Sequence, residues 1–343
     1  MENGINNWQR RWHPLLQQWV LIAATSGNRP WSGAMAQATL ETELEHDPDC
    51  YLCPSVSRAN GNKNPDYTGT HSFDNDYPSL SPLAPANTSE QPEFLTTAQA
   101  NGRCRVLCWS ERHDLRLASL PEKALIAAFE LCRDEYQLLS SAKDAQYVVI
   151  FENKGKEVGM SNSHPHGQAY AVPFVPDTTL RMRSAQHHYF ADHGSHLMQD
   201  MLEHEHTQSE LVVTQNDYWS CLVPFAARFP FETWVVPRRH VNSLLDLTAI
   251  ELKHLALLYQ EQLQRYDILF DRITPNLTMF HSGPCDGDPT STSSCFHIAM
   301  QPPLLTPTRL KYLAGWESSA GNITNPVQPE FAASQLRSAL PSD

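Results

Sequence analysis

Apolar and polar positions along this chain alternate in short blocks typical of strands, interrupted by longer stretches with helical spacing. The apolar runs predict strands at residues 18–23, 105–109, 146–151, 168–174, 211–214, 219–223 and 233–236, up to Phe280-His281, and around 295–299. Ser119-Leu120-Pro121-Glu122 and Thr248-Ala249-Ile250-Glu251 have the capping-box pattern, and each opens an apolar-periodic helix, to about Leu139 and Tyr266. A polar stretch after residue 174 is predicted to be helical to about residue 206. The pattern therefore predicts a mixed protein of strands and helices.

The second half of the chain repeats the plan of the first. One predicted strand runs into Arg112-His113, another runs into Arg239-His240 127 residues later, and a predicted helix follows each. His164 and His297 lie 133 residues apart, so Ala299 stands where the first half has His166. The similar offsets predict an internal duplication, with halves at residues 1–177 and 178–343.

Size and charge exclude several classes of function. A chain of 343 residues with 41% hydrophobic residues forms either one large domain or two units. The formal net charge of −13, with 25 scattered basic residues, argues against nucleic acid as a partner. The apolar run near the start is too short for a signal peptide or a membrane span, so we expect a cytoplasmic protein without a membrane partner.

The stretch Asn162-Ser163-His164-Pro165-His166-Gly167-Gln168 concentrates chemically active side chains on restricted backbone. Pro165 favours extended geometry at His164, and alternate side chains of an extended segment share a face. His164, His166 and Gln168 are therefore expected to point the same way. Two hypotheses fit this geometry: a His-x-His metal clasp, or one metal ligand and one nucleophile with an amide beside it.

Cys50 and Cys53 form a Cys-x-x-Cys pair, which in a cytoplasmic protein indicates a metal or redox site. Two more ligands are needed to close a tetrahedral site, and His113 and His164 are candidates; the alternative is two surface thiols and two ordinary histidines. The other close pair, Cys104 and Cys108, follows the alternation of a buried strand.

His166 offers a nucleophilic function, since a neutral imidazole can attack phosphorus and leave a phosphoramidate that another nucleophile opens. Gln168, Ser161 and Asn153 lie close in sequence and can donate to the phosphoryl oxygens. The alternative is a hydrogen-bonded loop histidine.

The chain resembles the galactose-1-phosphate uridylyltransferase family, a branch of the histidine triad superfamily. The resemblance covers roughly residues 12–317. It is carried by Phe151-Glu152-Asn153-Lys154-Gly155, Ser161-Asn162 and the His164 to Gln168 motif, with further matches at Arg29-Pro30-Trp31, Asp47-Pro48-Asp49-Cys50 and Pro230-Phe231-Glu232-Thr233.

This resemblance implies an α+β fold of duplicated histidine-triad-like halves, with antiparallel sheets flanked by helices. It implies a homodimer with shared active sites, which exchanges UMP between UDP-glucose and galactose 1-phosphate through a uridylyl-histidine on His166. By the same resemblance Gln168 and Ser161 assist His166, and Cys50, Cys53, His113 and His164 bind one structural Zn2+. The implied substrate-binding residues fall into groups: Leu52, Phe73, Asn75, Asp76 and Tyr77 for uracil and ribose, Arg29 and Lys311 for phosphate, Trp316 and Glu317 for the hexose, and Asn153 near His166.

Departures from the family pattern affect the second metal site and the sugar. The positions of the family's second metal site hold Met182 and Ala299, so we expect that site to be absent. The sugar-binding tail carries Trp316 where the family has tyrosine. An alternative function is therefore a related nucleotidyltransferase, or a nucleoside-diphosphate-sugar phosphorylase, that uses a different sugar 1-phosphate or base.

Overall fold

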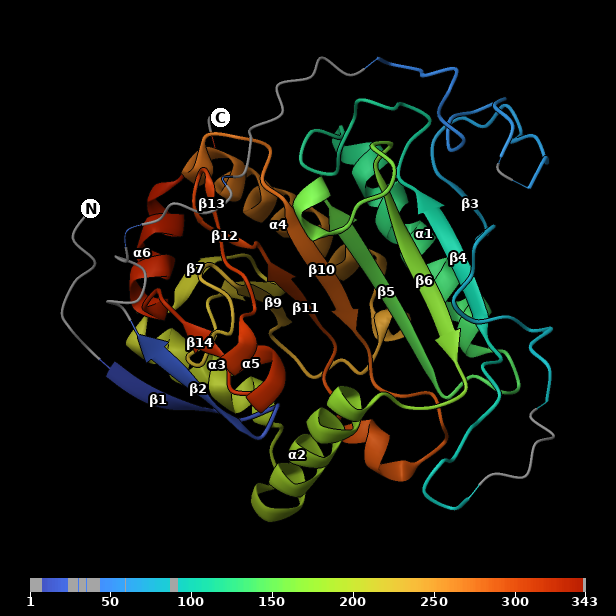
Figure 1. Ribbon diagram of the computed structural model, residues 1–343. Helices are drawn as coiled ribbons and strands as arrows, with labels where there is room; N and C mark the ends of the chain where they lie inside the picture. The colour runs from blue at the N-terminus through green and yellow to red at the C-terminus, as the bar shows by residue number, and fades with distance from the viewer. Residues whose placement is uncertain are drawn as a thin grey trace.

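The computed structural model describes residues 8–23, 30, 35, 44–58, 60–86 and 92–341 of the chain, and every structural statement below concerns these residues. They form one large sheet, a smaller sheet at the N-terminus and a short two-stranded sheet. Figure 1 shows the large sheet face-on, with α1 (Glu122–Ser140) and α4 (Ala249–Phe270) behind it. None of the helices described there combines the length and the apolar character needed to cross a membrane.

The large sheet has the strand order β3-β4-β6-β5-β10-β11-β9-β8-β7, and all neighbouring strands in it are antiparallel. Its strands are β3 His71–Asp74, β4 Arg103–Cys108, β5 Tyr147–Lys154, β6 His166–Val172, β7 Val212–Gln215, β8 Trp219–Leu222, β9 Thr233–Pro237, β10 Asn276–His281 and β11 His297–Gln301.

Two copies of one motif build this sheet. The chain runs β4, α1, β5, β6 in the first half and β9, α4, β10, β11 in the second, and in space the three strands lie in the orders β4-β6-β5 and β9-β11-β10. The copies join where β5 pairs with β10. The expected α+β fold of duplicated halves with antiparallel sheets flanked by helices is confirmed. The boundary between residues 177 and 178 stays a prediction.

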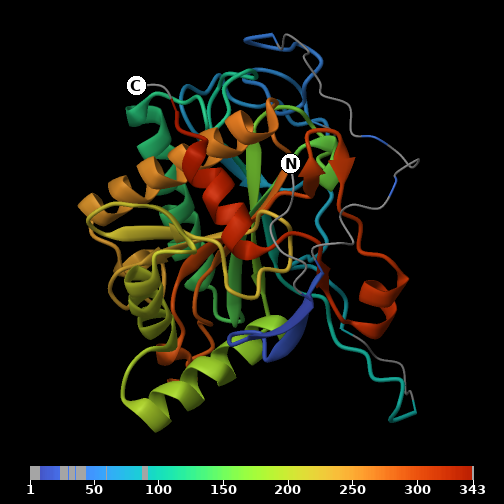
Figure 2. The same cartoon turned by 90° about the vertical axis from the view of Figure 1, so that its left-hand side faces the viewer.

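The main core lies between the sheet and the two long helices. Phe129 of α1 packs edge-to-face on Tyr259 of α4, with ring centroids 5.5 Å apart, and both rings are buried together with Phe280 of β10 and Phe296, which immediately precedes β11. Figure 2 shows the molecule from the side, with α4 on one side of the sheet and α5 (Gly315–Ala320) on the other. Because the long helices cover one face, substrates can approach the sheet only from the other face or from its ends.

The remaining elements surround this unit. They are β1 Trp8–His13, β2 Gln18–Ala23 and β14 Thr324–Asn325 in the N-terminal sheet, the β12–β13 pair at Leu304–Thr306 and Arg309–Leu310, α2 Asp177–His193, α3 Leu197–Gln208, α6 Pro329–Ser338, and the short 3-10 helices Lys156–Val158, Leu244–Asp246 and Pro289–Ser293.

The two predicted capping boxes have different outcomes. At the start of α4, Thr248 and Glu251 form the reciprocal pair, so that prediction is confirmed, and the helix runs four residues beyond Tyr266 to Phe270. The box predicted at Ser119 is wrong, since α1 begins at Glu122 with Pro121 at the cap and no side-chain cap bond. The Ser119 hydroxyl instead contacts the backbone of Arg116.

Candidate active site

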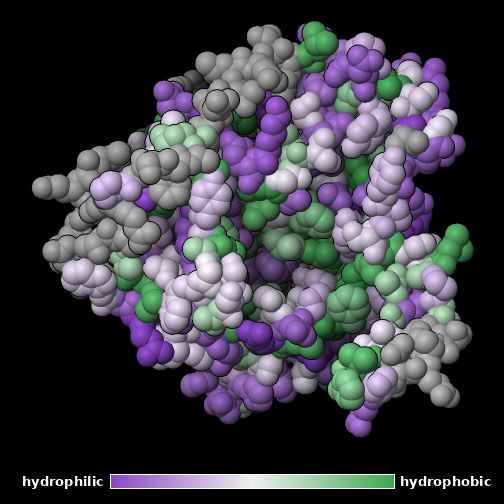
Figure 3. All heavy atoms as spheres, in the orientation of Figure 1, coloured by the Kyte–Doolittle hydropathy of each residue, from purple (hydrophilic) through white to green (hydrophobic). Residues whose placement is uncertain are grey.

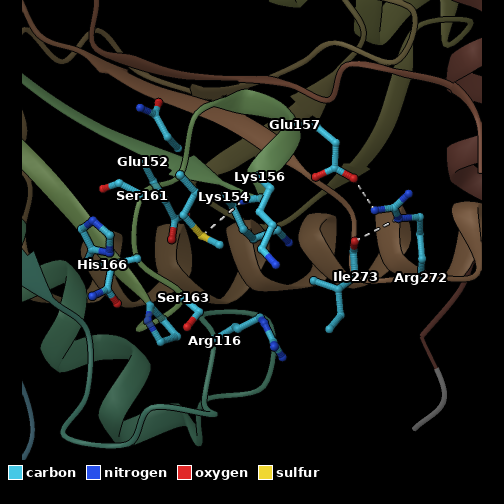
Figure 4. Close-up of a pocket in the computed structure, with 15 residues that line it drawn as sticks. Arg116, Glu152, Lys154, Lys156, Glu157, Ser161, Ser163, His166, Arg272 and Ile273 are labelled. Carbon is cyan, nitrogen blue, oxygen red and sulfur yellow. Dashed lines mark hydrogen bonds and ion pairs between the residues drawn. The ribbon is translucent and has the colours of Figure 1, made fainter. Parts of the chain in front are cut away.

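A cavity is lined by residues from the end of β5 and the start of β6. Figure 1 shows these two strand ends at the top of the sheet. Asn153, Ser161 and His166 line it, so the structure brings together three residues that the sequence singled out. Figure 4 shows His166 on one side of the cavity, Lys154 and Lys156 at its centre, and the Glu157–Arg272 ion pair on the other side, with an N–O distance of 2.6 Å. This end of the sheet thus combines an imidazole with hydroxyl, amide and cationic groups.

His166 is held as a neutral imidazole with a fixed tautomer. Its Nδ1 lies 2.7 Å from the backbone carbonyl oxygen of His164, so Nδ1–H donates and the lone pair is on Nε2. Burial lowers the pKa of His166 below its ordinary value of 6.5, although the hydrogen bond to His164 acts in the opposite direction. A neutral imidazole with a free Nε2 is the form that can attack phosphorus.

Gly167 lets the strand carrying His166 pass closely over an indole. A Cβ added at Gly167 would lie 2.3 Å from Cζ2 of Trp109, so any side chain larger than hydrogen displaces the ring. The Nε1–H of Trp109 donates to the buried carboxyl group of Glu152 at 3.0 Å. The glycine of the motif is therefore a packing requirement beside His166.

Gln168 follows His166 on the same, partly exposed face of β6. It is paired with Val106 on one side and Phe151 on the other, and Val106 is paired in turn with Phe73 of β3. The side-chain Nδ2 of Asn75 lies 3.5 Å from Oε1 of Gln168. Phe73 and Asn75, both predicted to bind substrate, therefore lie in the same part of the sheet as Gln168. Figure 3 shows this face of the molecule hollowed near its centre, with hydrophobic residues on the walls.

The other residues predicted to bind the base and ribose of the substrate differ in how exposed they are. Leu52 is fully buried in a cluster with Tyr67 and Phe73. Asp76 accepts a hydrogen bond of 2.7 Å from Asn60 and lies 3.8 Å from Arg58. The side chain of Tyr77 is 78% exposed, so in this structure only the backbone of Tyr77, which donates to Asn75, is fixed.

Four buried residues from three separate segments meet in a candidate metal centre. The ligand atoms of Cys50, Cys53, His113 and His164 all lie within 4.8 Å of one another. Sγ of Cys53 is 3.5 Å from Nδ1 of His113 and 3.5 Å from Nδ1 of His164. The structure thus brings His164, and not His166, to the thiols, which favours the divided function of the two histidines over the metal clasp.

The surroundings of this set suit a metal ion. Nε2 of His164 lies 3.0 Å from the carbonyl oxygen of Ser110, which fixes Nε2 as the donor and leaves Nδ1 with its lone pair. Burial lowers the pKa of His164 to about 4 and raises the pKa of the Cys53 thiol to about 12. A thiolate at Cys53 therefore needs the charge of a bound cation. The set can hold a metal ion, and Cys104 and Cys108 lie buried on β4 as expected.

Three residues predicted to bind the sugar or the phosphate lie outside the cavity that contains His166. Lys311 and Glu317 form a buried ion pair with an N–O distance of 2.6 Å, and Trp316 is 58% exposed. None of the three lines the cavity that contains His166. The prediction for Arg29 lies outside the described residues.

The second half holds no repeat of the paired-histidine motif. His281 and His297 stack with ring centroids 4.7 Å apart and line a small cavity with Met182 and Ala299. Burial lowers the pKa of His297 to about 4 and that of His281 well below its usual range. The expected absence of a second metal ion stays a prediction.

Several residues of the site were given no function by the sequence analysis. Lys154 is buried; its Nζ lies 3.8 Å from a carboxylate oxygen of Asp267 and has no hydrogen-bond partner among the described residues, and it lines the cavity together with Arg116. Tyr170 donates to Gln168 at 2.9 Å. Tyr170 could have been predicted from the sequence, because it follows Gln168 at the same two-residue spacing that places His166 and Gln168 on one strand face. Arg116 could not, because only the fold brings its loop to the cavity.

A neutral imidazole at the start of a strand, followed by a glycine and an amide on a duplicated antiparallel fold, is the arrangement of a group-transferring enzyme. The chain belongs to the galactose-1-phosphate uridyl transferase family and is a uridylyltransferase enzyme. Residues 2–176 match the model of that family's N-terminal domain, and residues 182–342 match the model of its C-terminal domain.

Characterised relatives match over nearly the whole chain. The galactose-1-phosphate uridylyltransferase of Rattus norvegicus is 39% identical, over 95% of this chain and 86% of its own length. That of Haemophilus influenzae is 35% identical, over 96% of this chain and 93% of its own length. A solved uridylyltransferase mutant superposes with a TM-score of 0.77 at 26% identity and covers 85% of this chain and 94% of its own. The resemblance stated from the motifs is confirmed.

Proposed function

We propose that the protein exchanges UMP between UDP-glucose and galactose 1-phosphate through a covalent uridylyl group on His166. The observation that carries the proposal is the 2.7 Å contact between Nδ1 of His166 and the carbonyl oxygen of His164, which leaves Nε2 as the attacking atom. Membership of the family supports transfer of UMP between sugar phosphates.

The proposed reaction has two balanced steps. In the first, Nε2 of His166 forms a bond to the α-phosphorus of UDP-glucose, and the bond from that phosphorus to the bridging oxygen breaks. Glucose 1-phosphate leaves with the electron pair. In the second, a phosphate oxygen of galactose 1-phosphate attacks the same phosphorus, the N–P bond breaks, and UDP-galactose leaves with His166 neutral again. The His164 carbonyl stabilises the positive charge that the ring carries between the steps.

Donors near His166 support the transfer. We assign Gln168 and Ser161 to the non-bridging oxygens of the phosphoryl group and Asn153 to substrate binding, because Ser161 and Asn153 line the cavity and Gln168 follows on the same strand face. Leu52, Phe73, Asn75, Asp76 and Tyr77 are assigned to the uridine, with the support of the contact between Asn75 and Gln168.

We propose that the metal of the Cys50, Cys53, His113 and His164 set is one structural Zn2+. Zn–S bonds of about 2.3 Å and Zn–N bonds of about 2.0 Å at tetrahedral angles place sulfur and nitrogen about 3.5 Å apart. This agrees with the two 3.5 Å distances from Cys53. Since the backbone of His164 orients His166, a metal on the ring of His164 holds the nucleophile without touching substrate.

We also propose a cytoplasmic homodimer with shared active sites. The support is the position of Lys311, Trp316 and Glu317, which belong to the predicted sugar and phosphate site but do not line the cavity of their own chain. In a dimer they can serve the His166 of the partner subunit.

Covalent labelling tests the proposal. The protein is incubated with UDP-glucose labelled at the α-phosphate, denatured in alkali, and assayed for retained label. Retained label in the wild type and in His204→Ala, which removes an exposed histidine of α3, together with its loss in His166→Ala, is the expected result. Absence of label in the wild type, or equal label in His166→Ala, contradicts the covalent mechanism.

A chase identifies the acceptor. Labelled enzyme is mixed with galactose 1-phosphate, with other sugar 1-phosphates, or with inorganic phosphate. Fastest discharge by galactose 1-phosphate supports the proposed exchange. Discharge by phosphate alone would instead make the protein a phosphorylase.

A further inference from the structure

The amide of Gln168 has one end occupied and the other available. Its Oε1 accepts a hydrogen bond of 2.9 Å from the hydroxyl of Tyr170, and Nδ2 of Asn75 lies 3.5 Å from the same oxygen. Both partners meet the carbonyl end of the amide. The NH2 end can therefore donate to another group, and His166 lies two residues before it on the same strand face.

Tyr170 is itself firmly placed. It occupies the next outward position of β6 after Gln168, where it is paired with Cys104 of β4 and Val149 of β5. Its ring packs edge-on against Phe151, with centroids 5.1 Å apart and an interplanar angle of 83°. Burial raises the pKa of Tyr170 above its ordinary value, while a hydrogen bond involving Ser79 acts in the opposite direction. The hydroxyl therefore keeps its proton at neutral pH and remains a donor.

We propose that Tyr170 is a positioning residue that fixes the amide of Gln168 with its NH2 group toward the phosphoryl group carried by His166. This rests on the proposed function, because the amide matters only if charge develops on phosphoryl oxygens there. A half-turn of the amide would set its NH2 group against that of Asn75, and the Tyr170 hydroxyl would have to accept a hydrogen bond from the amide instead of donating one. The half-turn would also point a carbonyl oxygen toward the developing negative charge, which an N–H stabilises and a C=O repels.

The test is the rate of a single uridylylation of His166 by UDP-glucose. Tyr170→Phe removes only the hydroxyl and keeps the ring packed on Phe151. We expect labelling at saturating UDP-glucose to slow about fivefold to tenfold, the effect of losing one hydrogen bond, with the concentration for half-maximal rate unchanged. In a Gln168→Ala background the same substitution should change the rate by less than about twofold, because the group it positions is gone.

A matched control separates positioning from general damage. Tyr189→Phe removes a hydroxyl that donates to Asp200 at 2.8 Å, on α2 and away from His166, and should leave labelling unchanged. Equal rates for Tyr170→Phe and the wild type would overturn the inference, as would an equal loss with and without Gln168. A wild-type protein that takes up no label refutes the proposed function itself, whereas normal wild-type labelling with an unaffected Tyr170→Phe refutes only this inference.

Discussion

Replacing Gly167 by alanine tests the packing that holds the strand carrying His166. The new Cβ would meet Cζ2 and Cη2 of Trp109 at 2.3 and 2.6 Å and the carbonyl oxygen of Phe151 at 3.0 Å. The indole is buried and its Nε1–H is bonded to Glu152, so it cannot swing into solvent without breaking that bond. The strand or the ring has to move, and both lie next to His166.

The magnitude follows from two costs. Forcing an extra methyl group into a packed core costs about 1–3 kcal/mol. Displacing the indole also leaves the buried carboxyl group of Glu152 short of a donor, since its other partner, Tyr259, is 3.5 Å away. An unsatisfied buried group costs about 1–3 kcal/mol more. We therefore expect Gly167→Ala to lower the free energy of unfolding by about 4 kcal/mol.

Urea unfolding of the wild type, Gly167→Ala, Trp109→Phe and the double variant measures this cost and its cause. The atoms Cζ2 and Cη2 belong to the six-membered ring of the indole and are absent from phenylalanine. In a Trp109→Phe background, Gly167→Ala should therefore cost less than about 1.5 kcal/mol. A change below about 0.5 kcal/mol in the wild type would refute the reasoning, and so would an equal cost in both backgrounds.

Three further predictions concern charge and metal. Since burial lowers the pKa of His166, the pH at which the uridylylation rate falls to half its maximum should lie below 6.5, the ordinary pKa of a histidine; a midpoint at or above pH 6.5 contradicts this. Cys53→Ser should reduce the bound metal from about one ion per chain to a small fraction and lower the melting temperature, measured by elemental analysis and calorimetry; metal content equal to that of the wild type would rule out the four-ligand centre. Hydrogen bonds from Arg239 lower the pKa of Glu251 from 4.5 to about 2, so the contribution of this pair to stability is full above pH 4.5 and is lost as the pH falls through about 2. The difference in unfolding free energy between Glu251→Gln and the wild type should therefore shrink between these pH values. A difference that does not change with pH would contradict the assignment.

Sequence patterns were sufficient to predict features that are formed by residues close together in the chain. Thr248 and Glu251 lie three residues apart, so their capping box and the helix that follows could be read directly. The same holds for His166 and Gln168, which share a strand face because side chains alternate. Ser119 shows the limit, since Pro121 takes the cap position and the serine turns to a neighbouring backbone instead.

The sequence by itself determined that one short motif places an imidazole and an amide on the same strand face, and that two cysteines form a pair that needs two more ligands. Only the tertiary structure showed that the expected ligands come together, because Cys53, His113 and His164 belong to segments that meet through folding. It also decided that the carbonyl of His164 sets the tautomer of His166, and that Tyr170 and Asn75 share one oxygen of Gln168. Such contacts depend on strand register and loop position, which residue spacing alone does not specify.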